Sequence, residues 1–113
     1  MSDAWHSAGR PDAAGLVRTA ERLADRLRLL GPRWAARDRP DDAAPASAVR
    51  IGLQRLADLA AAAEGEPSRP VPDLGLHALA DQLLVLTRDV AATGNAAALA
   101  AADSVLATLR VAL

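Results

Sequence analysis

The chain contains no cysteine, lysine, phenylalanine or tyrosine, and its only aromatic side chains are two tryptophans. Without cysteine there is no disulfide, thiolate metal site or cysteine nucleophile. Without lysine there is no lysine-based catalysis and no complete phosphate-loop motif, because the lysine of that motif contacts the phosphates. These absences exclude several classes of enzyme and metalloprotein before any pattern is considered.

The charged residues are nearly balanced: 13 basic residues, all of them arginine, face 14 acidic residues, for a net charge of -1. This balance does not favour a globally basic nucleic-acid-binding protein. The 113 residues are enough for one domain, and alanine and leucine supply most of the 51% hydrophobic content. We therefore expect a single small core built from aliphatic side chains.

The first residues show neither the basic nor the apolar segment of a secretory signal. The longest uncharged run, between Asp89 and Asp103, is too short to span a bilayer. We therefore predict a cytoplasmic protein without a membrane-spanning segment. Residues 1–11 are predicted to form a flexible arm, and residues 12–113 a single domain.

Apolar residues recur at alternating steps of three and four along most of the chain, which predicts amphipathic helices and leaves no competing strand pattern. Four such stripes are present. Their members are Leu16, Ala20, Leu23, Leu27, Leu30 and Trp34, then Val49, Leu53, Leu56, Ala60 and Ala63, then Leu76, Leu79, Leu83, Leu86 and Val90, and finally Leu99, Ala102, Leu106, Leu109 and Leu113.

Capping and breaking residues mark the ends of these helices. Asp12 is a suitable N-cap for the first helix, and Pro32 predicts that this helix ends or kinks near Leu30. Pro45 suits the first turn of the second helix, with Asp42 as a possible cap.

The clearest break is the segment 64–73, which holds three prolines and one glycine. Asp73 is the predicted N-cap of the third helix, while Gly94 and Asn95 suit the end of that helix and the cap of the fourth. The predicted fold is all-α, an antiparallel four-helix up-and-down bundle made of two helical hairpins.

Several apolar side chains fall outside the stripes when the helices are drawn at about 100° per residue. On the third helix, Leu74, Ala78 and Val85 lie opposite the stripe and Leu84 lies to one side. They indicate either a wider core or a second packing surface, and Trp34 is either a core residue or a partner-binding anchor. The candidate interaction residues are Leu74, Ala78, Leu84, Val85, Ile51 and Trp34; further outward apolar residues are Leu29 and Val111.

An alanine-rich bundle without phenylalanine or tyrosine buries little area per residue, so dimerisation would supply additional burial. The predicted function is therefore that of a small non-enzymatic helical interaction protein, which forms a homodimer or binds a helical protein partner.

Arginines recur along one flank of the first helix, and residues 16–39 carry a net charge of +4 whereas residues 57–113 carry -4. The flank comprises Arg18, Arg22, Arg26 and Arg37. Three interpretations stay open: pairing with acids inside the bundle or across a dimer, binding an acidic partner, and binding an anion or nucleic acid. The last, an anion- or nucleic-acid-associated regulator, is the alternative function, although no aromatic interleaving or helix-turn-helix pattern supports nucleic acid.

The two histidines, His6 and His77, do not predict a catalytic site. Asp81 stands four residues after His77, where its charge opposes a phosphoryl group and where a surface contact between the two side chains is the simpler expectation. Two possible ligands do not make a metal site, and no Ser–His–Asp set is apparent. No catalytic, cofactor-binding or metal-binding residue is predicted.

Overall fold

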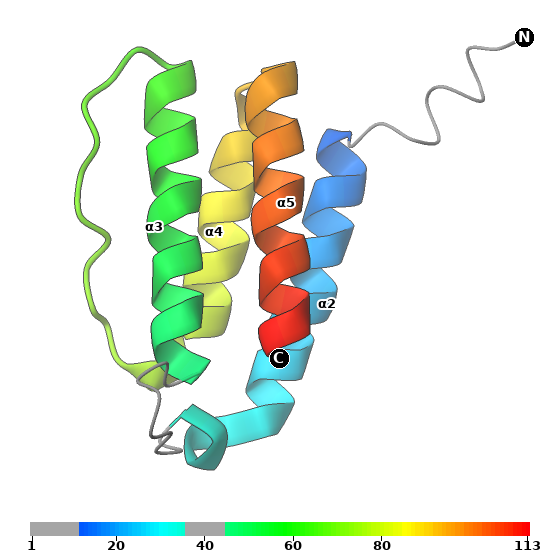
Figure 1. The fold of residues 1–113 in the computed structure, drawn as a ribbon, viewed down its shortest axis with the longest axis vertical. Coiled ribbons are helices and arrows are strands. Elements are labelled where there is room, and N and C mark those ends of the chain that lie inside the picture. Colours follow the sequence, from blue (N-terminus) through cyan, green and yellow to red (C-terminus); the bar gives the residue numbers. More distant parts are fainter. Residues whose placement is uncertain (1–11, 36–44) are drawn as a thin grey trace, which may run out of the picture.

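The computed structural model describes residues 12–35 and 45–113, which form four α-helices and one 3₁₀ turn without any strand (Figure 1). The elements are α2 (Ala13–Ala35), α3 (Pro45–Ala63), η1 (Leu76–Ala78), α4 (Leu79–Ala92) and α5 (Ala96–Ala112). The prediction of an all-α four-helix bundle is confirmed within these residues. The predicted arm at 1–11 and the possible cap Asp42 lie outside the described residues.

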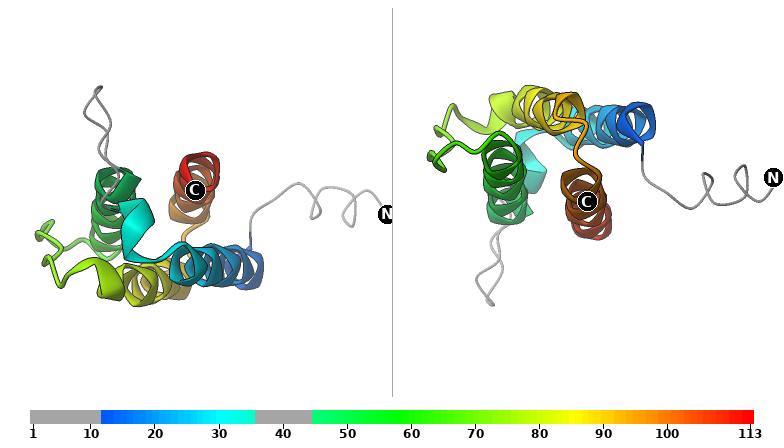
Figure 2. Two further views of the ribbon diagram at one scale, coloured as in Figure 1. Left: turned by 90° about the horizontal axis from the view of Figure 1, so that it is seen from below. Right: turned by 90° about the horizontal axis from the view of Figure 1, so that it is seen from above.

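Seen end-on, the helices occupy four corners in the order α2, α4, α3, α5 (Figure 2). Helix α2 packs mainly on α4 and next on α5, while α3 packs on both α5 and α4. Helices joined by the two shorter connections, α2 with α3 and α4 with α5, run in opposite directions, as in a helical hairpin (Figure 1). They nevertheless stand on diagonals of the bundle, and this order was not predicted from the sequence.

Residues 64–75, which we call the strap, run along the outside of the bundle from the end of α3 to the start of η1 (Figure 1). Twelve extended residues span up to about 40 Å, more than the roughly 28 Å of a 19-residue helix. The strap therefore returns the chain to the opposite end of the bundle, and α4 runs parallel to α3. Successive helices therefore run in opposite directions within each hairpin, α2–α3 and α4–α5. The alternation is interrupted between α3 and α4, which run in the same direction.

The predicted boundaries of α2 and α3 are confirmed. The carboxylate of Asp12 accepts a hydrogen bond of 2.5 Å from the backbone N–H of Gly15, which satisfies a donor of the first turn. Gly31 adopts φ 68° and ψ -176°, so α2 kinks there, immediately before a proline, and continues as a short helical segment. Helix α3 begins with Pro45 at its first position.

The start of α4 differs from the prediction. Asp73 does not cap this helix; its carboxylate accepts a hydrogen bond of 3.0 Å from the N–H of Gly75, whose φ of 93° is incompatible with a helix. The chain then forms the η1 turn, and α4 begins only at Leu79. Leu76, expected in the buried stripe, is exposed as a result.

The junction between α4 and α5 is as predicted. Gly94 follows the last turn of α4 with φ 63°, in the left-handed region that glycine adopts readily. The side-chain oxygen of Asn95 accepts a hydrogen bond of 2.9 Å from the N–H of Ala98 and so caps α5.

The core of the described residues consists of leucine, valine and alanine, with one buried threonine. Its largest fully buried side chains are Leu16, Leu53, Leu56, Leu83, Leu106 and Leu109. Gly52 is also buried, and a Cβ atom there would lie 3.0 Å from a methyl carbon of Leu109, so a glycine lets α3 approach α5 closely. The small residues keep the bundle narrow, which limits the apolar area that each residue buries.

Thr87 gives a first prediction, because its side chain is fully buried and its hydroxyl has no hydrogen-bond partner among the described residues. Thr87→Val keeps the shape and removes the unsatisfied hydroxyl, so we expect the free energy of unfolding to rise by about 1 kcal/mol in chemical denaturation.

The matched control is Thr108→Val on α5. That hydroxyl is exposed and donates a hydrogen bond of 3.1 Å to the backbone oxygen of Ser104, so we expect almost no change. A loss of stability in Thr87→Val would show that the buried hydroxyl has a partner, such as an internal water.

Candidate interaction groove

A groove of about 520 Å³ lies between α4 and the strap, and we call it the strap groove. Its apolar lining includes Val85 of α4, Ala78 of η1, and Val71, Pro72 and Leu74 of the strap. Leu74 and Val85 are each 55% exposed, although both are large and apolar. The structure thus brings together three of the six side chains predicted to form a second packing surface.

The strap is fixed to α3 by the side-chain amide of Gln54. Its Nε2 donates hydrogen bonds of 2.9 Å to the backbone oxygen of Arg69 and to the carboxylate of Asp58. Its Oε1 accepts a hydrogen bond of 2.8 Å from the N–H of Val71. The carboxamide therefore pairs with the strap on both sides of a proline, much as one peptide group of a neighbouring strand would.

Three further contacts hold the strap beside the groove. Nε2 of Gln82 on α4 donates a hydrogen bond of 2.9 Å to the backbone oxygen of Pro72. Arg50 on α3 donates to the carboxylate of Asp73 at 3.3 Å, and Val71 packs against the core. Gln54 and Gln82 are the chain's two glutamines, and both of them bind the strap.

Asp58 stabilises the same attachment through its charge. Hydrogen bonds from the hydroxyl of Ser68 and from the side-chain amide of Gln54 lower the pKa of the Asp58 carboxyl below its ordinary value of 3.8. Because both donors favour the ionised form, the attachment is strongest while Asp58 carries its negative charge.

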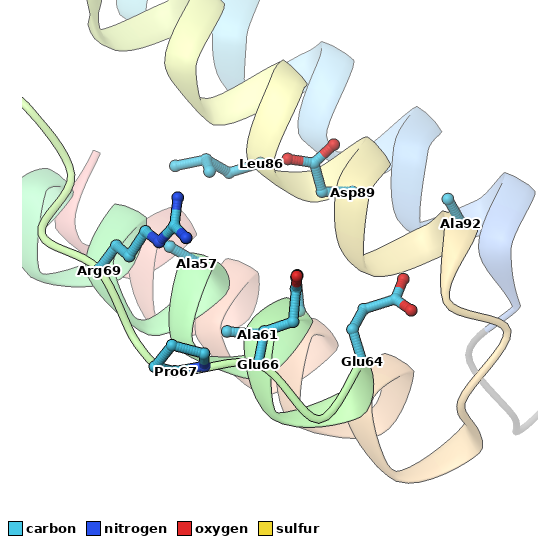
Figure 3. A pocket seen from close by; sticks show the side chains of 10 residues that line it. Ala57, Ala61, Glu64, Glu66, Pro67, Arg69, Leu86, Asp89 and Ala92 are labelled. Atoms are coloured by element: carbon cyan, nitrogen blue, oxygen red, sulfur yellow. The ribbon is translucent and has the colours of Figure 1, made fainter.

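A second hollow of about 360 Å³, which we call the acidic hollow (Figure 3), shares part of its lining with the strap groove. Glu64, Glu66 and Asp89 line it, and Arg69 and Leu86 belong to the linings of both. Within the described ranges, none of these three carboxylates forms an ion pair. The combined lining is mainly apolar toward the start of α4, where Asp81 is paired with Arg28, and carries three carboxylates and Arg69 toward the end of α4.

The remaining candidate interaction residues lie elsewhere. Ile51 lines a separate hollow of about 260 Å³ on the α3 side of the strap, where it is exposed. Leu84 is partly buried against the core, as the wider-core interpretation expected. The side chain of Trp34 lies outside those that the structure describes.

The arginine flank does not form one continuous site. Arg26 donates two hydrogen bonds, of 3.1 and 2.8 Å, to the backbone oxygen of Leu113 beyond the last turn of α5, where a cation is favoured. Arg18 and Arg22 are exposed, and no ion pair is found for either within the described part of the chain. Arg37 lies outside the described residues.

Other charges join α2 to α4. Arg28 contacts Asp81 at 2.7 Å, and Arg88 contacts Glu21 at 3.7 Å. Asp81 therefore pairs with an arginine of α2. All four side chains are about half exposed or more, so each pair contributes little to stability, and the pairs mainly mark the antiparallel register.

Comparison of the chain with protein-family models finds no match, and comparisons with curated proteins and with solved structures find no significant match. None of the described helices combines the length and the apolar character needed to cross a membrane. Within residues 12–35 and 45–113, no three histidine, aspartate or glutamate side chains are grouped so that they could hold a metal ion.

The amide contacts of the strap give a second prediction. Gln54→Leu removes three hydrogen bonds and leaves the N–H of Val71 without its partner. We expect a loss of about 1–3 kcal/mol in the free energy of unfolding and faster hydrogen exchange at the Val71 amide. The comparison variant is Gln82→Leu, which removes a single hydrogen bond and should cost less. Unchanged exchange at Val71 in Gln54→Leu would contradict the assignment.

The lowered pKa of Asp58 gives a third prediction. A folded-state pKa below 3.8 means that this carboxylate stabilises the protein above that pH and ceases to do so as the pH falls through the folded value. Wild type should therefore be more stable than Asp58→Asn at neutral pH, and the difference should shrink below about pH 4. Chemical denaturation across the pH range measures this difference.

The control for this series is Ser68→Ala, which removes the hydroxyl that donates to Asp58. In that background, replacing Asp58 should change stability less and with a weaker dependence on pH. A difference between wild type and Asp58→Asn that stays constant down to strongly acidic pH would refute the assigned hydrogen bonds.

Proposed function

We propose that this chain is a small non-enzymatic helical interaction protein that self-associates through the strap groove. The observation that carries the proposal is the collection of Leu74, Ala78 and Val85 in a single groove. Clustered apolar side chains on the surface of a small protein are typical of interfaces, whereas apolar side chains exposed singly are common everywhere.

The composition of the core supports association with another surface. The described core contains no aromatic side chain and several alanines, so the isolated bundle buries limited apolar area. Covering the strap groove would remove Leu74 and Val85 from water and add to that area. A second copy is the partner we propose first, because a homodimer supplies the burial without any other component. A cytoplasmic location stays a prediction.

The fourth prediction tests the groove directly. We expect wild type to form a dimer in sedimentation velocity and in light scattering across a concentration series. Leu74→Glu combined with Val85→Glu places two charges in the groove and should shift the protein to monomer, because an interface does not bury unpaired charges without a large cost.

The matched control is Val111→Glu. Val111 is an apolar residue of α5 with 89% of its surface exposed, and it lies outside the strap groove. This variant should leave the mass of the particle unchanged. Circular dichroism of every variant checks that the helices are retained. A wild-type monomer at every concentration would overturn self-association, and a dimer that persists in the groove variant would place the interface elsewhere.

A further inference from the structure

We propose that the partner of the strap groove is helix α2 of a second copy, through an exposed stripe formed by Leu29, Arg22 and Arg18. This inference rests on the self-association proposed above and adds which surface fills the groove. The stripe is a candidate because Leu29 is 87% exposed and lies on the same face of α2 as the two arginines, seven and eleven residues away.

The charges of the two surfaces are complementary. The groove is apolar where Ala78 and Val85 line it and acidic where Asp89, Glu64 and Glu66 line it. The stripe on α2 begins with Leu29, continues with Asp25, which pairs with Arg28 of the same helix at 3.3 Å, and ends with Arg22 and Arg18. Its apolar end would enter the strap groove while its arginines meet the acidic hollow, whose three carboxylates outnumber the single cation Arg69 in the same lining.

The spacings also agree. At 1.5 Å per residue, Leu29 is about 10 Å from Arg22 and about 16 Å from Arg18 along the helix. In the groove, the midpoint between Ala78 and Val85 is about 11 Å from Asp89 along α4, measured in the same way. Glu64, Glu66 and Ala92 line the same hollow, and Ala92 is about 16 Å from that midpoint along α4.

The direction and height of α2 suit a closed dimer. The pairs Arg28–Asp81 and Arg88–Glu21 set α2 antiparallel to α4 within one molecule. This register places Leu29 level with the apolar part of the groove and Arg18 level with the acidic hollow. A two-fold axis parallel to the helices would therefore place the α2 of each copy at the matching height beside the groove of the other, without any shift along the axis.

The fifth prediction is a charge-reversal experiment in which two variants rescue each other. One variant carries Arg18→Glu with Arg22→Glu, and the other carries Glu66→Arg with Asp89→Arg. In a dimer of either variant alone, the α2 stripe of one copy and the acidic hollow of the other carry charges of the same sign. The dissociation constant of that dimer should therefore rise on the order of tenfold or more. Mixed in equal amounts, they restore opposite charges at both contacts and should form a heterodimer about as stable as the wild-type dimer.

A matched control changes the net charge by the same amount at other sites. Arg55→Glu with Arg110→Glu reverses two exposed arginines on α3 and α5 that line neither the strap groove nor the acidic hollow. Sedimentation velocity of each variant, of the equimolar mixture and of the control should show that the control dimerises like wild type and that mixing restores the dimer.

The two proposals fail in different ways. If wild type dimerises and Leu74→Glu with Val85→Glu disrupts the dimer, but the charge reversals change nothing or mixing does not restore it, the groove interface stands and α2 is not its occupant. If wild type never dimerises, both proposals are overturned together. If mixing the two charge-reversal variants restores the dimer, and mixing either of them with the control does not restore it, α2 is established as the occupant of the groove.

Discussion

The side-chain amide of Gln54 provides the attachment on which the rest of this structure depends. A segment with three prolines forms neither helix nor sheet, and its remaining backbone groups need partners once it lies against a protein surface. Gln54 supplies a donor and an acceptor at one point, to Arg69 and to Val71. With that anchor in place, Val71 reaches the core and the strap follows the full length of the bundle.

The strap in turn determines the topology and the site. Because it returns the chain to the end at which α3 begins, α3 and α4 are parallel neighbours, and α4 and α5 stand on a diagonal. The strap then covers part of the junction between α3 and α4 and leaves a groove along the outer face of α4. Two of the three prolines of the strap, Pro70 and Pro72, thus line the strap groove.

The helices could be predicted from the sequence because their information is local. Each helix cap and the kink depend on only a few neighbouring residues. The predicted caps Asp12 and Asn95 and the predicted kink near Gly31 are all confirmed. The order of the helices could not be predicted, since similar leucine and alanine stripes fit several arrangements of four corners. The role of the strap was missed because the partners of its backbone come from Gln54 and Gln82, which look like ordinary polar surface residues in a helical pattern.

The candidate groove was predicted in its apolar part and missed in its acidic part for the same reason. Helical spacing in the sequence groups Leu74, Ala78 and Val85, and the structure brings them together in one groove, although Leu74 lies in the strap and Ala78 in η1 rather than in α4. The acidic hollow joins Glu64 and Glu66, at the start of the strap, to Asp89, more than twenty residues away on another element.

The opposite net charges of residues 16–39 and 57–113 are partly neutralised by ion pairs within one molecule and partly left exposed. Some are paired at the surface of one molecule, where Arg28 of α2 meets Asp81 of α4. Arg18 and Arg22 lie on the outer face of α2, whereas Glu64, Glu66 and Asp89 gather beside α4. Ion pairing within one molecule therefore leaves Arg18 and Arg22 exposed on α2 and three carboxylates in the hollow beside α4, and the proposed dimer would bring these opposite charges together.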